Sequence, residues 1–214
     1  MSRAGSRASA DGEVGVLRWV VFDYGEVISV RTRALPELAA MLGTDPESFE
    51  TAYFAERVAY DRGGTDTDYW RAVGAHFDVE VDDTRVEALT GTDTEGWLDT
   101  DTETLRLIDE LVDAGVTLAL LSNAPSTFAR VAEQQPWARN FEHLVFSGDL
   151  RLGKPDAAIY LHLLDTIAAR PKDCLFFDDR RENIDAAREA GLHAETWTGA
   201  EAARRKLREL GVLG

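Results

Sequence analysis

The spacing of hydrophobic and polar positions changes twice along this chain. Residues 17–22 form an apolar run that only Arg18 interrupts, which predicts a buried parallel strand. Between about residues 32 and 97, apolar positions recur at helical spacing instead. Beyond residue 98, short apolar runs alternate with helical repeats. The pattern therefore predicts an α/β chain with an all-helical insert after its first strand.

The insert is predicted to hold four helices and no strand. Gly43 follows the first apolar repeat as a C-terminal stop, and Pro46 stands where a second helix would begin. The pair Gly63-Gly64 breaks that second helix. Two further helices are expected around Tyr69–Phe77 and around Val86–Leu89.

The rest of the chain alternates between strands and helices. The predicted strands are 116–121, 144–146, 175–177 and 194–197, and the predicted helices are 105–112, 126–135, 157–169, 180–190 and 201–210. Such alternation implies right-handed crossovers and a parallel sheet with helices on both faces. We expect a doubly wound, Rossmann-like α/β core over residues 15–31 and 98–214, the helical insert over 32–97, and a disordered tail over 1–14.

Composition excludes several classes of protein. The formal net charge of −16 opposes binding to a nucleic-acid backbone. No apolar run approaches the roughly 20 residues of a membrane span, and residues 1–12 lack the apolar centre of a secretion signal. The single cysteine, Cys174, excludes an internal disulfide. We expect a cytoplasmic protein with no nucleic-acid or membrane partner; composition indicates nothing about its oligomeric state.

Polar residues end three of the predicted strands, where parallel sheets bind their ligands. Asp23 follows the first strand, Ser122-Asn123 closes the second, and Asp178-Asp179 follows a later one. A fourth segment, Gly153-Lys154-Pro155-Asp156, places a lysine on a stiff loop before a helix. Since these segments lie far apart in sequence, only the fold can bring them to one edge of the sheet.

Together the four segments predict a metal and phosphate site. Asp23 alone would most simply be a turn residue, but at the end of a central strand it can act as a nucleophile or a metal ligand. Asp178 and Asp179 repel each other unless a cation such as Mg²⁺ compensates, the alternative being an acidic helix N-terminus. Ser122 and nearby backbone N–H groups can bind phosphate, with which Lys154 can pair.

These residues resemble the haloacid dehalogenase superfamily, in its subfamily I with a small helical cap. The resemblance extends from Leu17 to Leu210 and rests on four motifs that agree in order, spacing and strand context. The segments DYGEV, LLSNAP, GKPD and FFDDRRENIDAA are most similar to the branch that contains alpha-glucose-1-phosphatase. The resemblance implies a hydrolase with Mg²⁺ as cofactor, whose insert would be a cap that closes over the site.

The resemblance also implies a role for each matching residue. Asp23 would be the nucleophile, and Asn183 would support the fourth motif. The implied catalytic residues are Asp23, Ser122, Lys154 and Asp178; the substrate-binding residues are Tyr24, Gly25, Ser122, Asn123 and Lys154; and the metal ligands are Asp23, Asp179 and the Gly25 carbonyl. In the insert and at its N-terminal border, Arg31, Arg33, Tyr60 and Arg62 are candidates to determine the substrate.

Gly25 departs from the family pattern. Phosphatases of the family usually carry an aspartate two positions after the nucleophile, which protonates the leaving group and then activates water. The branch named above tolerates its loss, and Glu26 or water could replace it. Since general acid–base catalysis is worth roughly 10²–10⁴-fold, we expect weak activity on alkyl phosphates and better activity on aryl phosphates or sugar 1-phosphates.

Three alternative functions are compatible with these residues. The first is a magnesium-dependent phosphatase that hydrolyses a small phosphorylated metabolite, with a sugar phosphate as one candidate, through an aspartyl phosphate on Asp23. The second is a metal-free dehalogenase, against which the Asp178-Asp179 pair argues because it adds uncompensated negative charge. The third is a catalytically weak protein that binds a phosphometabolite, because Gly25 replaces the acid. Magnesium dependence separates the first from the second.

Overall fold

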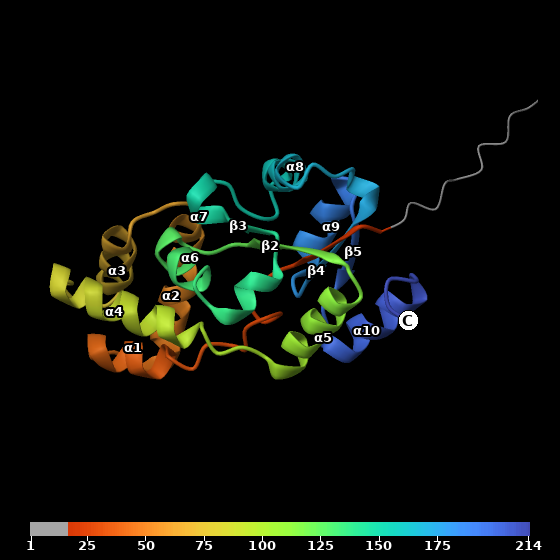
Figure 1. Ribbon diagram of the computed structural model, residues 1–214. Helices are drawn as coiled ribbons and strands as arrows, with labels where there is room; N and C mark the ends of the chain where they lie inside the picture. The colour runs from red at the N-terminus through yellow and green to blue at the C-terminus, as the bar shows by residue number, and fades with distance from the viewer. Residues whose placement is uncertain (1–16) are drawn as a thin grey trace, which may run out of the picture.

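A parallel sheet of five strands forms the centre of the molecule (Figure 1). The computed structural model describes residues 17–214, so the tail predicted over 1–14 lies outside the described residues. The strand order is β3-β2-β1-β4-β5, with bounds β1 Trp19–Phe22, β2 Thr117–Ser122, β3 His143–Phe146, β4 Cys174–Asp178 and β5 His193–Thr196. Every neighbouring pair is parallel. The predicted doubly wound, Rossmann-like fold is confirmed.

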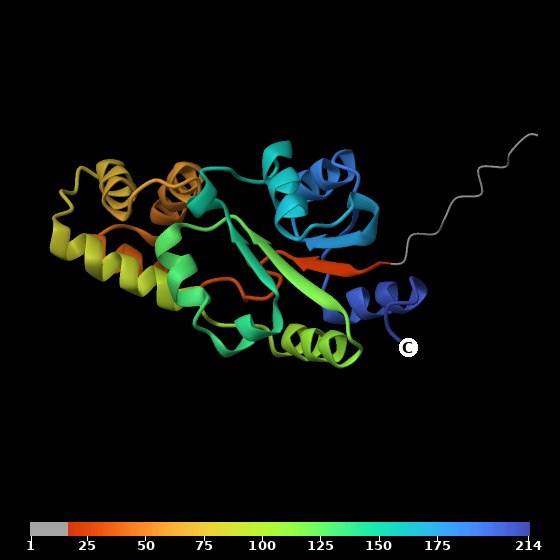
Figure 2. The ribbon, with the colours of Figure 1, turned by 45° about the horizontal axis from the view of Figure 1, so that its top comes forward.

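Helices cover both faces of this sheet (Figure 2). Their bounds are α5 Thr102–Asp113, α6 Ser126–Ala132, α8 Ala157–Thr166, α9 Arg181–Glu189 and α10 Ala200–Glu209. Alternate side chains of β1 face opposite ways: Val20 and Phe22 pack with α5, α6 and α10, whereas Val21 packs with α8 and α9. A strand buried on both faces is nearly continuous in apolar residues, which explains the run that precedes Asp23.

Four helices of the insert share a third hydrophobic cluster of their own. They are α1 Leu35–Leu42, α2 Pro46–Asp61, α3 Asp66–Ala75 and α4 Asp83–Gly96, and no strand lies between residues 32 and 97. Tyr53 and Trp70 are fully buried in this cluster. Side chains of Asp45, Thr65 and Asp82 cap the N-termini of α2, α3 and α4. The exact domain boundaries stay a prediction.

The two connections between the insert and the core lie side by side. Ser29 and Thr100 form an isolated antiparallel bridge. On either side of it, Val30 N–H donates to the Asp99 carbonyl at 2.9 Å and Asp101 N–H donates to the Ile28 carbonyl at 2.8 Å. The chain therefore leaves the core after β1 and returns before α5 at almost the same place.

Two helices end earlier than the sequence predicts, and three short helices were not expected. Helix α8 ends at Thr166 rather than at 169. Helix α6 ends at Ala132 rather than at 135, and a 3₁₀ helix, η1 (Pro136–Asn140), follows it. A single-turn helix, α7 (Ser147–Leu150), and a second 3₁₀ helix, η2 (Pro171–Asp173), were not predicted, since one turn is too short to show a helical repeat. Within residues 17–214, no helix has both the length and the apolar character needed to cross a bilayer.

Candidate active site

A cavity of about 530 Å³ lies between the insert and the ends of β1, β2 and β4. Its lining on the core side includes Asp23, Gly25, Ser122, Asn123, Lys154, Asp179 and Asn183, and on the side of α2 it includes Phe54, Arg57, Val58, Asp61 and Arg62. The fold thus brings the four sequence segments around one cavity, as expected for side chains at the carboxyl ends of parallel strands.

Lys154 lies at the base of this cavity between two carboxylates. Its Nζ is 2.6 Å from Asp23 Oδ1 and 2.7 Å from Asp178 Oδ2, and its side chain is only 1% exposed. Burial by itself would lower the pKa of Lys154, but the two carboxylates outweigh that effect and raise the pKa. The lysine therefore stays charged and offsets part of the local negative charge.

Asn123 holds the loop that carries Lys154. Its Nδ2 donates to the Lys154 carbonyl at 2.9 Å, and its Oδ1 accepts from the Lys154 backbone N–H at 2.8 Å. This pair of hydrogen bonds joins the end of β2 to the lysine loop across 31 residues of sequence. The amide of Asn123 positions Lys154 in this structure, and the residue's predicted part in substrate binding stays a prediction.

Asp178 is buried and fully occupied by donors. Besides Lys154, its oxygens accept from Arg180 N–H at 2.8 Å and from Asn183 Nδ2 at 2.9 and 3.0 Å. Burying a carboxylate is costly unless it is paired and hydrogen-bonded, and these donors provide that pairing. The hydrogen bonds from Asn183 place that residue, at the start of α9, beside the site, and the supporting role of Asp178 stays a prediction.

The acidic side chains fit a divalent cation. Asp23, Asp178 and Asp179 each offer a carboxylate oxygen, and these atoms lie within 4.8 Å of one another. Burial raises the pKa of Asp23 to about 7, opposed by Lys154 and increased by Asp178, and burial likewise raises the pKa of Asp179. Hard oxygen donors with excess negative charge suit Mg²⁺, and the buried Oδ1 of Asn183 has no hydrogen-bond partner among the described residues.

The Tyr24 side chain is used for packing. Its hydroxyl donates to the Trp97 carbonyl at 2.7 Å, and its ring contacts Phe128 and Trp137. The backbone N–H of Tyr24 donates to Asp23 Oδ1 at 2.7 Å and so helps to orient that carboxylate. A contact between Tyr24 and substrate stays a prediction.

Sequence reasoning missed the part of α2 that faces the cavity. Of the four insert residues proposed earlier, Arg62 lines the cavity, whereas Arg31, Arg33 and Tyr60 do not. The additional lining residues of α2 are Phe54, Arg57, Val58 and Asp61. They follow the i, i+3, i+4, i+7 spacing of one helix face, which shows in the sequence that they lie together but not that they face the cavity.

Arg57 is the centre of a hydrogen-bond network in the insert. Its Nε donates to Asp61 Oδ1 at 2.9 Å, and its Nη1 donates to Asp93 Oδ2 at 2.8 Å and to the Tyr53 hydroxyl at 2.7 Å. Trp97 Nε1 donates to the same hydroxyl at 2.8 Å. These bonds fix the face of α2 that covers the cavity.

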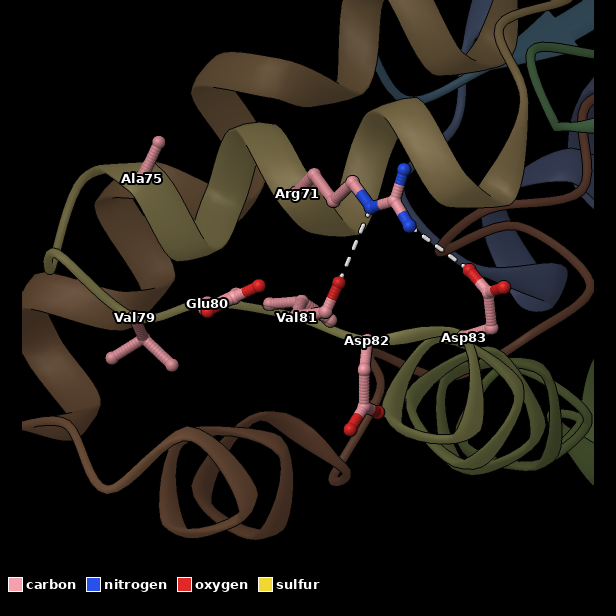
Figure 3. A pocket seen from close by; sticks show the side chains of 7 residues that line it. All are labelled: Arg71, Ala75, Val79, Glu80, Val81, Asp82 and Asp83. Carbon is pink, nitrogen blue, oxygen red and sulfur yellow. Dashed lines mark hydrogen bonds and ion pairs between the residues drawn. The ribbon is translucent and has the colours of Figure 1, made fainter.

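A second hollow in the insert, between α3 and the start of α4, has a different character (Figure 3). Arg71 spans it, donating to the Val81 carbonyl at 3.2 Å and to Asp83 at 2.9 Å. Its other lining residues are Ala75, Val79, Glu80 and Asp82. It contains neither a buried carboxylate nor a nucleophile, so the cavity at Asp23 is the candidate active site.

Comparison with characterised sequences agrees with this geometry. A family model described as haloacid dehalogenase-like hydrolase matches residues 17–191. Phosphoglycolate phosphatase 1 of Pseudomonas aeruginosa is 32% identical over 85 residues, which are 39% of this chain and 31% of that protein. A sesquiterpene phosphatase of Aspergillus oryzae is 30% identical over 124 residues, 58% of this chain and 63% of that protein. The matches thus span from about a third to under two thirds of these relatives.

Solved structures show the same fold. A HAD family enzyme of Bacteroides thetaiotaomicron has a TM-score of 0.72 at 19% identity, covering 91% of this chain and 99% of that one. An L-2-haloacid dehalogenase of Xanthobacter autotrophicus has a TM-score of 0.71 at 14% identity, covering 93% and 85% of the two chains. The likeness to the alpha-glucose-1-phosphatase branch stays a prediction. Because the family model spans most of its length, the chain belongs to the haloacid dehalogenase-like hydrolases.

Proposed function

We propose that this hydrolase is a magnesium-dependent phosphatase acting on a small phosphorylated metabolite. The observation that carries the proposal is Lys154 held between Asp23 and Asp178, with Asp179 close by, at the floor of the cavity. Phosphatases among the relatives support it, as does a HAD family structure of Bacteroides thetaiotaomicron in complex with magnesium and inorganic phosphate, with a TM-score of 0.66.

In the proposed reaction, Asp23 attacks phosphorus. A bond forms between the Asp23 carboxylate and phosphorus while the bond to the leaving-group oxygen breaks, and that oxygen keeps the electron pair. Lys154 and Ser122 bind the phosphoryl oxygens and offset their growing negative charge. Water then attacks the aspartyl phosphate, releasing inorganic phosphate and restoring Asp23.

Asp23, Asp179 and the Gly25 carbonyl are the proposed Mg²⁺ ligands, with Asp178 in support. The bound ion would neutralise charge on the phosphoryl group. Asp178 keeps Lys154 in place through its 2.7 Å contact, so the lysine can turn from Asp23 toward the substrate without losing its second partner. The insert covers the cavity and excludes bulk water.

The family's usual acid for protonating the leaving group is absent, because residue 25 is glycine. Gly25 has no side chain, and a Cβ at that position would lie 3.9 Å from the Trp97 ring, so an aromatic surface borders the space. Glu26 lines the cavity and stays the candidate to replace the family acid, beside water. We therefore expect faster hydrolysis of aryl phosphates than of alkyl phosphates.

The test is hydrolysis of 4-nitrophenyl phosphate with Mg²⁺ and with a chelator, using the wild-type protein and Asp23→Asn. Activity that requires both Mg²⁺ and Asp23 supports the proposal. Activity that requires Asp23 but is unaffected by the chelator would contradict the magnesium dependence. No hydrolysis in any condition would contradict the phosphatase and favour the metal-free dehalogenase or a phosphometabolite-binding protein, which a chloride-release assay on 2-chloropropionate would then distinguish. Equal rates on aryl and alkyl phosphates would contradict the account of Gly25.

A further inference from the structure

Every cation that lines the cavity is already paired with a carboxylate. Arg57 is bound by Asp61 and Asp93. Arg62 is paired with Asp156, and Arg180 is 2.8 Å from Glu182. Lys154 lies between Asp23 and Asp178. Among the described residues of the lining, none is a cation without an acidic partner that could receive a second anionic group of a substrate.

Carboxylates also outnumber cations around the cavity. The acids in the lining are Asp23, Glu26, Asp61, Asp179 and Glu182, and the cations are Arg57, Arg62, Lys154 and Arg180. Three further carboxylates, outside the lining, form ion pairs with these cations: Asp93 with Arg57, Asp156 with Arg62, and Asp178 with Lys154. One divalent ion would offset negative charge at the floor, next to Asp23 and Asp179. On the insert side, the three carboxylates of Asp61, Asp93 and Asp156 are paired with only two cations, Arg57 and Arg62, so one negative charge remains there.

Asp61 is the carboxylate that the insert presents to the cavity. It is the last residue of α2, and its backbone carbonyl accepts a hydrogen bond from the Ser147 hydroxyl, which ties it to the core. Its Oδ1 accepts from Arg57 Nε, while no donor among residues 17–214 bonds its Oδ2. Its side chain is 15% exposed. One oxygen of a fixed, poorly hydrated carboxylate is therefore free to accept a hydrogen bond.

We propose that Asp61 selects phosphate esters whose leaving group is neutral and carries hydroxyl groups, and rejects those whose leaving group carries a carboxylate. A hydroxyl can donate to Asp61 Oδ2, whereas a carboxylate would meet like charge with no unpaired cation near it. Phe54 and Trp97 in the same lining provide apolar surface for the carbon skeleton. The inference rests on the proposed phosphatase activity and narrows its substrate class.

The test compares substrates that differ in a single group. Glucose 1-phosphate and glucuronate 1-phosphate share the phosphate and the ring but carry a hydroxymethyl group or a carboxylate. We expect wild-type kcat/KM to be lower for the glucuronate ester, and Asp61→Asn to raise the glucuronate-to-glucose ratio about tenfold. That factor corresponds to about 1.4 kcal/mol, the repulsion of two unit charges about 6 Å apart at an effective dielectric constant of about 40.

Asp93→Asn is the matched control. Asp93 binds the same guanidinium, but it is buried in α4 and does not line the cavity. Its substitution removes the same charge from the same network. Because Asp93 does not line the cavity, the substitution should leave the substrate ratio within twofold. An unchanged ratio in Asp61→Asn, or an equal change in both variants, would overturn the proposal. Circular dichroism and Tm would show that both variants fold.

Two further outcomes keep this inference separate from the proposed function. If Asp61→Asn does not fold, the wild-type ratio decides, and a preference for the glucuronate ester overturns the selectivity. If the wild-type protein hydrolyses neither ester, the 4-nitrophenyl phosphate assay decides whether the phosphatase proposal fails. In that case, calorimetric binding of both esters to Asp23→Asn still tests the selectivity: tighter binding of the glucose ester supports it, and equal or weaker binding contradicts it.

Discussion

Replacing Lys154 by methionine tests how the site is held together without metal. The variant keeps the length and apolar stem of the side chain but leaves Asp23 and Asp178 with no cation between them. At an effective dielectric constant of about 20, each attraction at these distances is worth about 6 kcal/mol. Desolvation of the buried ammonium offsets much of this, so the expected net loss is about 3–5 kcal/mol, as for other buried pairs that lose one partner.

For a chain of this size, such a loss lowers Tm by roughly 10 °C. The assay is thermal unfolding at pH 8 in a chelator, with Lys172→Met as control because Lys172 is exposed. Magnesium should then raise the Tm of Lys154→Met more than that of the wild-type protein, since the ion takes over the compensation of charge. A Tm of Lys154→Met within 2 °C of wild type in chelator would refute the reasoning.

Three further predictions concern packing, thiol reactivity and pH. In Gly148→Ala, the new Cβ would lie 2.7 Å from Ser126 N and 2.8 Å from the Ala124 carbonyl oxygen, so we expect a loss of about 1–3 kcal/mol by chemical denaturation. Gly91→Ala, whose Cβ would meet nothing within 4 Å, is the control and should not destabilise. Burial raises the pKa of the Cys174 thiol to about 12, so a disulfide reagent at pH 8 should label it only after denaturation; rapid labelling of the native protein would contradict this. Burial raises the pKa of Asp61 to about 6; Arg57 and Arg180 oppose this effect and Asp93 adds to it. Because the carboxyl becomes neutral below that pH, the glucuronate-to-glucose ratio of kcat/KM should rise from pH 8 to pH 5 in the wild-type protein. The same ratio should stay flat in Asp61→Asn.

Much of the core, and the grouping of Asp23, Lys154 and Asp178 at the base of the cavity, could be predicted because both depend on short-range patterns. A strand buried on two faces is apolar throughout, so the first polar residue after it, such as Asp23, marks its end. Parallel pairing then places Asp23 beside the ends of β2 and β4, whose register aligns Phe22 with Leu120 and Phe177. The catalytic roles of these residues stay predictions.

The insert side of the cavity was harder to predict because it depends on how α2 is rotated against the core. The face of Arg57 and Asp61 mixes charged and apolar residues, so periodicity does not show whether it faces solvent or a ligand. Arg57 resembles a surface residue in sequence, yet the carboxylates of Asp61 and Asp93 come from two helices to surround it. Likewise, no local pattern shows that the amide of Asn123 would bind the backbone of Lys154.

The antiparallel bridge between Ser29 and Thr100 has a consequence for how such a protein can evolve. Because the chain leaves and re-enters the core at neighbouring points, the segment between them can be lengthened, shortened or exchanged without separating β1 from β2. A short turn could close the same gap. Mutations at the proposed catalytic residues of the core and at the proposed specificity residue Asp61 can therefore accumulate in different stretches of the gene, with little interference between the two.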